Sequence, residues 1–214
     1  MRAVTKYKAD ASFLPLSLFE RVALKNLCEV AKRLDSRIAI PATSSNFSLR
    51  CGPQRFFISK SGVHKRNLTP VSFLRVQLDG KAVHPLAPKP SDETLLHAVL
   101  YRLFENVNCI LHCHAPEIEF LRFPSARLEG HELLKALGAP GHEEPLDLTV
   151  FRNNQNMVTL SEEVEARFHQ ELASSQSLAK GIFVLERHGI YCGGKDVQQA
   201  EARLEALLHL LETQ

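Results

Sequence analysis

Three histidines in the sequence have the spacing and the neighbours that a metal site needs. His112 and His114 follow a run of apolar residues, and alternate side chains of a β-strand point to the same face. His188 ends a second apolar run and precedes Gly189, which would let the backbone turn away. Three imidazoles with one open position are typical of a catalytic zinc site. We therefore predict one Zn²⁺ ion per chain on these histidines, although imidazole sites also accept other divalent ions.

Three short polar loops carry the residue types that a phosphate group requires. They cover residues 44–48, 59–62 and 89–93. Hydroxyl groups, small residues and helix N-terminal amides all place hydrogen-bond donors close to an anion. Each loop alone is compatible with an ordinary turn. Together, beside a predicted metal site, they indicate a phosphorylated small-molecule substrate.

One further motif imitates a nucleotide-binding loop. Residues 189–195 read Gly, four residues, Gly and Lys, but Asp196 follows where a phosphate-binding loop has Ser or Thr. A carboxylate there would repel phosphates and could not supply a metal-binding hydroxyl. We interpret this segment as a turn before the final helix.

Hydrophobic periodicity predicts the elements that must carry these residues. The predicted helices are 16–34, 92–104 with Ser91 as its N-cap, 130–137, 161–172 and 197–211. The predicted strands are 47–50, 56–59, 74–78, 108–111, 146–151 and 181–185. Strands and helices are interspersed without the regular alternation of a doubly wound sheet. We expect an α/β fold with a mixed or mostly antiparallel sheet covered by helices.

Composition excludes several classes of protein. Lys and Arg number 26 against 24 Asp and Glu, too balanced for a dedicated nucleic-acid-binding protein. No segment approaches the apolar length of a membrane span, and residues 1–18 lack the unbroken apolar stretch of a signal peptide. The five cysteines are odd in number and include no CxxC pair, so a disulfide framework is not expected. We predict a single cytoplasmic domain over residues 1–214, without a membrane or nucleic-acid partner.

Over most of its length the sequence resembles the class II aldolase/adducin-like family. The motifs that carry the resemblance are Asn46-Phe47-Ser48, Ser59-Lys60-Ser61-Gly62, Pro90-Ser91-Asp92-Glu93, His112-Cys113-His114 and Arg187-His188-Gly189. One departure is Ser45, which stands where the family usually has glycine. The resemblance implies a three-layer α/β/α fold, a sugar-phosphate substrate, and a homotetramer with sites near subunit interfaces.

Within that family, segments 89–97, 130–135 and 151–156 are most similar to members that dehydrate 5-methylthioribulose 1-phosphate in methionine salvage. The resemblance implies that Glu132 is the acid/base, with Glu93 as its rival, because Glu93 matches the proton shuttle of the family's aldolases. Lys135 lies on the same helix face as Glu132. The candidate substrate or phosphate contacts are Asn46, Ser48, Ser61, Gly62, Lys89, Ser91 and Lys135.

Two other functions remain open at this point. The first is a zinc aldolase or epimerase acting on a related sugar phosphate. The second is a non-enzymatic, adducin-like interaction module, which would have no reason to keep three metal ligands together. The segment around Glu132 favours the dehydratase over the aldolase.

Three expectations concern residues outside the predicted site. Cys113 should point away from His112 and His114, into the core. Most of the remaining histidines should face solvent. The final helix carries more leucine than one face needs, and we interpret the surplus as packing within the homotetramer, with packing in the core of the same chain as the alternative; these residues are Leu204, Leu207, Leu208 and Leu211.

Overall fold

One eight-stranded sheet organises the part of the chain that the structure describes. The structure is a computed structural model, and it describes residues 15–38, 40 and 42–213, so most of the segment considered for a signal peptide lies outside it. The strands are β1 (Asn46–Gly52), β2 (Arg55–Ser59), β3 (Phe73–Gln77), β4 (Cys109–Cys113), β5 (Ser125–Leu128), β6 (Leu146–Phe151), β7 (Ile182–Leu185) and β8 (Gly189–Gly194). Their order across the sheet is β3-β2-β1-β4-β8-β7-β6-β5. Neighbours pair antiparallel, except that β6 and β7 run parallel.

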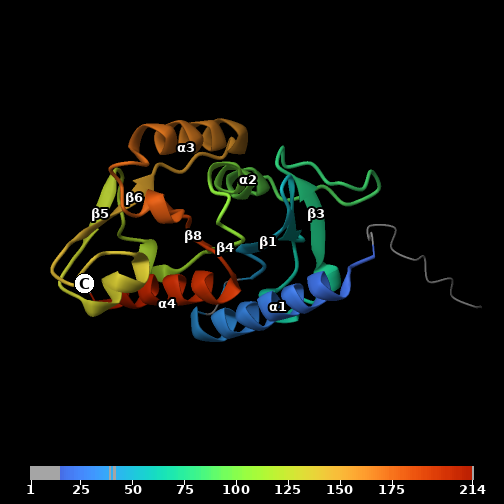
Figure 1. Ribbon diagram of the computed structural model, residues 1–214, viewed down its shortest axis with the longest axis horizontal. Helices are drawn as coiled ribbons and strands as arrows, with labels where there is room; N and C mark the ends of the chain where they lie inside the picture. The colour runs from blue at the N-terminus through green and yellow to red at the C-terminus, as the bar shows by residue number, and fades with distance from the viewer. Residues whose placement is uncertain (1–14, 39, 41, 214) are drawn as a thin grey trace, which may run out of the picture.

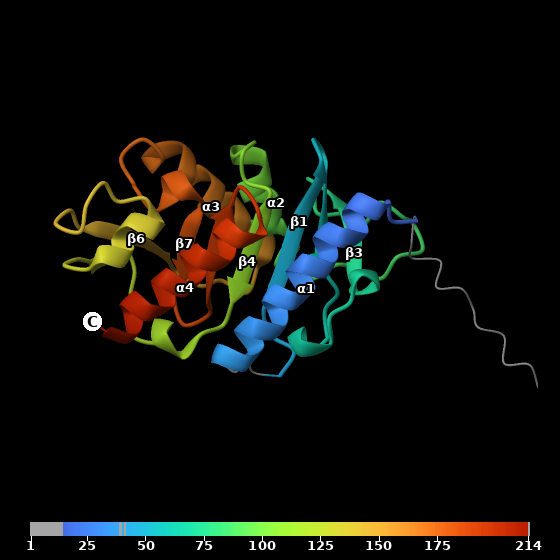
Figure 2. The same ribbon diagram turned by 60° about the horizontal axis from the view of Figure 1, so that its bottom comes forward.

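Helices cover both faces of this sheet. The α-helices are α1 (Leu18–Ile38), α2 (Thr94–Leu103), α3 (Met157–Glu171) and α4 (Val197–Thr213). Figures 1 and 2 show α1 and α4 on one face, with α2 and α3 on the other. Each face has its own core, because Leu111 of β4 packs with α1 and α4 while Ile110 packs with α2 and α3. The predicted three-layer α/β/α fold is confirmed.

Side-chain alternation along β4 places the predicted site. Cys113 belongs to the core under α1 and α4, as predicted, so His112 points to the opposite face of the sheet. All five cysteines are free thiols. None of the described helices combines the length and the apolar character that crossing a bilayer would require.

The interpretation of residues 189–195 as a turn is wrong. Residues 189–194 form β8, a fully buried strand between β4 and β7. Its glycines permit close packing, since a Cβ on Gly194 would lie 2.4 Å from the backbone nitrogen of Ala200 in α4. Glycine in a sequence usually indicates a turn, but here it indicates the approach of a helix to a strand. Strand β5 was also not predicted.

Three α-helices begin at other residues than predicted, and α1 begins at Leu18 instead of residue 16. Helix α2 begins at Thr94, and no side chain caps it, so Ser91 is not its N-cap. Helix α3 begins at Met157, four residues before the predicted start, because the side chain of Asn156 accepts a hydrogen bond from the N–H of Thr159.

The leucines of α4 are not a surplus. Leu204, Leu207 and Leu208 are completely buried within the chain, and Leu211 packs against the same core. They cover the sheet and contact η4 (Glu132–Leu137), a short 3₁₀ helix beside α4. Of the two interpretations, packing in the core of the same chain therefore holds for Leu204, Leu207 and Leu208, and the subunit interface does not.

Candidate metal centre

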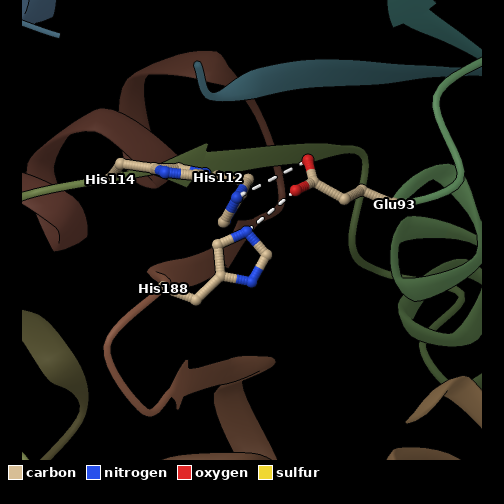
Figure 3. Close-up of side chains that lie close together, drawn as sticks. All are labelled: Glu93, His112, His114 and His188. Carbon is tan, nitrogen blue, oxygen red and sulfur yellow. Dashed lines mark hydrogen bonds and ion pairs between the residues drawn. The ribbon is translucent and has the colours of Figure 1, made fainter. Parts of the chain in front are cut away.

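The three predicted ligands come together with Glu93 at one end of the central strands. His112 and His114 lie at the end of β4, His188 lies between β7 and β8, and Glu93 directly precedes α2 (Figure 3). One ligand atom of each residue lies within 4.8 Å of the others. Oε1 of Glu93 is 2.8 Å from Nε2 of His188, and Oε2 is 3.7 Å from Nε2 of His112. The topology thus gathers four ligand-bearing side chains from three separate segments.

The nitrogen atoms of this cluster suit a divalent ion. Nε2 of His112 and Nε2 of His114 are buried and lack hydrogen-bond partners among the described residues, while Nε2 of His188 faces Oε1 of Glu93 (Figure 3). Nδ1 of His112 lies 3.0 Å from the carbonyl oxygen of Ile190. Because a carbonyl oxygen only accepts hydrogen bonds, Nδ1 carries the proton, and the lone pair of Nε2 stays available to a metal ion. The cluster therefore offers neutral imidazole nitrogens to a metal.

Electrostatics keep the cluster in the state that binds metal. Burial lowers the pKa of His112 well below its usual range and that of His114 to about 4, so both rings are neutral near pH 7. Burial alone would raise the pKa of Glu93, but the hydrogen bond that His188 donates to it has the opposite effect, and the pKa lies well below its ordinary value. Three imidazoles beside a carboxylate form a donor set that zinc and related ions accept.

Sequence reasoning predicted the histidines as ligands but did not include Glu93 among them. Its position was marked by the Pro90-Ser91-Asp92-Glu93 motif, whose polar residues were interpreted as a phosphate loop. Only the tertiary structure brings the start of α2 beside the end of β4.

An unusual backbone conformation at Ser45 helps to hold His114. Ser45 has a φ of +70°, the left-handed region that favours glycine, which explains why the family usually has glycine here. Its hydroxyl accepts a hydrogen bond of 3.1 Å from the backbone N–H of His114. This bond offsets the strain, of about 1–2 kcal/mol, and ties the loop to a candidate ligand.

Gly189 serves a purpose other than the predicted turn. The turn after β7 is made by Arg187, whose φ is +52°, whereas Gly189 lies in β8. A Cβ at Gly189 would lie 2.3 Å from Cε1 of His112 and 2.8 Å from the carbonyl oxygen of Cys113. The absence of a side chain thus makes room for the imidazole of His112.

A polar cavity of about 170 Å³ opens beside the cluster. It is lined by Thr43, Ser44, Ser45, Asn46, Ser59, Lys60, Ser61, Ser91, Glu93 and His114. The three polar loops therefore meet at one place. The cavity includes the predicted contacts Asn46, Ser61 and Ser91, and also Thr43 and Lys60, which were not among the predicted contact residues.

The other predicted substrate contacts lie elsewhere. Ser48 is completely buried, and its hydroxyl bonds to His97 and Tyr101, so its prediction as a substrate contact is wrong in this chain. Gly62 is absent from the cavity wall. Lys89 is 81% exposed and pairs with Asp92, while Lys135 pairs with Glu132.

Glu132 lies on the surface, outside the metal cluster of its own chain. Its side chain is 65% exposed, and its carboxylate pairs with Lys135 and lies 3.4 Å from His142. The hydrogen bond from Lys135 lowers the pKa of this carboxyl. Neither the described metal cluster nor the adjoining cavity includes Glu132.

His97 is an exception to the expectation that most of the remaining histidines face solvent. It is completely buried in α2, and burial lowers its pKa to about 3. Its two ring nitrogens contact Asn46 and Ser48. The helical pattern could not show this, because both partners lie on β1.

Comparison with known proteins agrees with this arrangement. The family model for the class II aldolase and adducin N-terminal domain matches residues 25–214. A methylthioribulose-1-phosphate dehydratase of Xanthomonas campestris is 42% identical over 178 residues, covering 80% of this chain and 78% of the relative. A protein of the same name from Stenotrophomonas maltophilia is 41% identical, over 80% of this chain and 79% of the relative.

Solved structures show the same fold at lower identity. An L-fuculose-1-phosphate aldolase from Thermus thermophilus superposes with a TM-score of 0.68 at 23% identity, covering 91% of this chain and 94% of the aldolase. A sugar-phosphate aldolase from Thermotoga maritima gives a TM-score of 0.62 at 18% identity, with 91% and 94% covered. With its fold, its His and Glu cluster and a family match that spans nearly the whole sequence, the chain belongs to the class II aldolase and adducin family.

Proposed function

We propose that the protein is a zinc-dependent hydro-lyase that converts 5-methylthioribulose 1-phosphate to 2,3-diketo-5-methylthiopentyl 1-phosphate in methionine salvage. The observation that carries this proposal is the identity of 42% to a methylthioribulose-1-phosphate dehydratase over most of both chains. The cluster of three histidines and Glu93, beside a cavity rich in hydroxyl groups, supports it. We further propose that it acts as a cytoplasmic homotetramer.

The reaction removes one molecule of water. The ketone at carbon 2 acidifies the proton on carbon 3, a base removes that proton, and the hydroxyl on carbon 4 leaves as water after protonation. The resulting enol rearranges to the 2,3-diketone, so that atoms balance. The protein must therefore bind a phosphate, polarise a ketone and move a proton.

The residues of the site divide these tasks. Ser61, Ser91 and the neighbouring hydroxyl groups of the cavity would bind the phosphate as hydrogen-bond donors. His112, His114 and His188 would hold the metal ion. A bound divalent ion supplies a Lewis acid for the oxygen atoms at carbons 2 and 3.

Two carboxylates are candidates for moving the proton. Glu132 is the candidate that the resemblance implies, and its exposed position requires that it act on the site of a neighbouring subunit. Glu93 is already at the cluster, 2.8 Å from His188. The position of Glu93 favours the second candidate function, an aldolase acting on a related sugar phosphate.

The experiment is a direct assay of the purified protein with 5-methylthioribulose 1-phosphate, in which diketone absorbance is recorded. We expect turnover that stops when a chelator removes the metal and returns when Zn²⁺ is added. L-fuculose 1-phosphate serves as the control substrate. Cleavage of the control substrate without dehydration of the first would contradict the proposal and favour the aldolase.

Two matched variants then distinguish the carboxylates. Glu132→Gln keeps the shape and removes the titratable group, so we expect kcat to fall by about 10²–10⁴ while zinc content stays unchanged. Glu93→Gln should reduce kcat less if Glu93 only shapes the site. A nearly normal Glu132→Gln variant beside an inactive Glu93→Gln variant would assign the proton transfer to Glu93.

A further inference from the structure

A chain of buried polar side chains leads from the metal cluster into the layer between β1 and α2. Its members are Glu93, Asn46, His97, Ser48 and Tyr101. Asn46 Nδ2 donates to Oε2 of Glu93, and Asn46 Oδ1 contacts Nε2 of His97. Ser48 Oγ lies 2.7 Å from Nδ1 of His97 and 2.8 Å from the hydroxyl of Tyr101. His97 and Ser48 are completely buried, so no water competes for these bonds.

The chemistry of the end group fixes the direction of every hydrogen bond. An ionised carboxylate only accepts, so Glu93 orients the amide of Asn46 with its nitrogen toward the carboxylate. The amide oxygen then faces His97, and only a protonated Nε2 can donate to it. Nδ1 must accept, so Ser48 donates to His97, and the hydroxyl of Tyr101 donates to Ser48. The arrangement therefore admits one tautomer of His97.

This chain can orient groups but cannot carry protons to the site. Burial lowers the pKa of His97 to about 3, so the ring stays neutral at physiological pH. The amide of Asn46 lies between His97 and Glu93, and an amide does not accept a proton on one side and release it on the other under these conditions. The series of hydrogen bonds can therefore only fix the positions of the side chains that it joins.

We propose that His97 is a positioning residue for the metal cluster: as its Nε2–H tautomer, it fixes the amide of Asn46, which holds Oε2 of Glu93. Oε1 of Glu93 is then directed toward His188, at 2.8 Å. The inference rests on the proposed function only for the measurements of dehydratase turnover; the tautomer and the zinc affinity are measured without substrate. His97 itself touches neither the cavity nor the described metal cluster.

The first test reads the tautomer directly. Solid-state ¹⁵N NMR of the zinc-loaded protein, labelled at histidine, is compared with the spectrum of the His97→Gln variant to identify the signals of His97. We expect one neutral ring with protonated Nε2 and bare Nδ1, unchanged between pH 6 and pH 8. A ring protonated at Nδ1, or a mixture of both forms, would overturn the inference.

The second test separates positioning from space filling. His97→Gln keeps an amide donor near the position of Nε2, whereas His97→Leu fills the space without a donor. We expect the zinc affinity or the kcat of the leucine variant to fall by about 10–100-fold, while its KM changes less than about threefold. The glutamine variant should recover most of this loss. Equal behaviour of the two variants would overturn the inference.

Two further variants serve as controls. Tyr101→Phe removes the far end of the chain and leaves Asn46 and His97 in contact, so its zinc affinity should stay within about threefold of the parent. If His97→Leu fails to fold, Ser48→Ala replaces it, because the amide oxygen of Asn46 still accepts only from a protonated Nε2 and the NMR spectrum should keep the single Nε2–H tautomer. A ring protonated at Nδ1, or a mixture of both tautomers, in Ser48→Ala would contradict the inference. A protein inactive on 5-methylthioribulose 1-phosphate with the expected tautomer and zinc affinities would contradict only the proposed function.

Discussion

At the scale of single residues, the ring of His112 is fixed by contacts that leave one nitrogen available. Nδ1 donates to the carbonyl oxygen of Ile190, and the ring stacks on Tyr191 at 4.1 Å between centroids. The side chain is completely buried. Such outer contacts commonly change metal affinity or activity by about 10–100-fold. His112 is therefore presented to the cluster in one orientation.

We expect His112→Ala to remove both bound metal and turnover while the chain stays folded. Two extensive cores, one on each face of the sheet, stabilise this fold without the ion. Elemental analysis and circular dichroism measure the two effects. His169→Ala, at an exposed position in α3, is the matched control and should keep its zinc. Unfolding of His112→Ala in step with metal loss would mean that the site is structural.

The sequence allowed the histidines to be predicted as ligands and Glu93 as a candidate acid/base, but not the place of Glu93 in the cluster or the residues that support it. A strand pattern places His112 and His114 on one face by local geometry alone. Asn46 and Glu93 are 47 residues apart, and Asn46 and His97 are 51 residues apart. No local periodicity reports such a contact. This is why Ser48 was interpreted as a substrate contact and the burial of His97 was not predicted.

At the scale of elements, one buried lysine holds the loop that lines the cavity. Nζ of Lys65, in the 3₁₀ helix Lys65–Asn67, donates to the carbonyl oxygens of Thr43 and Val63, each at 3.0 Å. Lys65 is only 1% exposed. Burial lowers its pKa to about 8, which makes its charge a pH-dependent contribution to stability.

We expect the free energy of unfolding to rise between pH 8 and pH 10 relative to a Lys65→Met variant. In this range the unfolded lysine, with a pKa of about 10.4, still binds a proton that the folded lysine has released. Stability rises with pH wherever the unfolded state binds more protons, here by about 2 kcal/mol. Urea unfolding of the metal-free proteins measures the difference. Lys81→Met, at an exposed position, should show no such rise.

We expect Gly189→Ala to displace His112 and to lower zinc affinity by about tenfold or more. The new Cβ would lie 2.3 Å from Cε1 of His112, so the ring or β8 must move. Overpacking of this kind also destabilises a core by about 1–3 kcal/mol. Gly52→Ala in β1 is the matched control, because its Cβ would meet only the Arg55 side chain at 3.6 Å. Equal zinc affinity in the two variants would contradict this role for Gly189.

Most elements could be predicted, and β8 shows why some could not. The strands and helices with a clear apolar period were recognised, because burial of one face or of both imposes that period. In β8 three buried residues, Ile190–Cys192, are flanked by glycines that make room for His112 at one end and for α4 at the other. These glycines are needed because distant segments pack closely against them. A single sequence does not identify those segments, so the strand was not predicted.

At the scale of the whole molecule, proton transfer by Glu132 would require more than one chain. The described cluster lacks Glu132, which is exposed and paired with Lys135. If a neighbouring subunit supplies Glu132, two variants with different defects can complement each other. The interface itself could not be predicted, because the leucines of α4 are used within the chain.

We expect a mixture of His112→Ala and Glu132→Gln chains to recover dehydratase activity after joint unfolding and refolding. Mixed oligomers contain sites with intact histidines from one chain and Glu132 from the other. Activity is measured against each variant refolded alone, and light scattering checks that oligomers form. A mixture no more active than its components would place each complete site within one chain.

The ligands of the candidate metal centre also have a consequence for the order of events in folding. Glu93 and His188 are 95 residues apart in the sequence. Strands β4 and β8 must pair before these two side chains can lie next to each other. Closing such long loops is entropically slow, so the ion should meet its complete site only after the folding barrier has been crossed. We expect Zn²⁺ to leave the refolding rate unchanged and to slow unfolding, because an interaction absent from the transition state acts on the unfolding rate alone. Stopped-flow refolding with and without chelator measures both rates; if zinc accelerates refolding, the centre assembles early and acts as a nucleus.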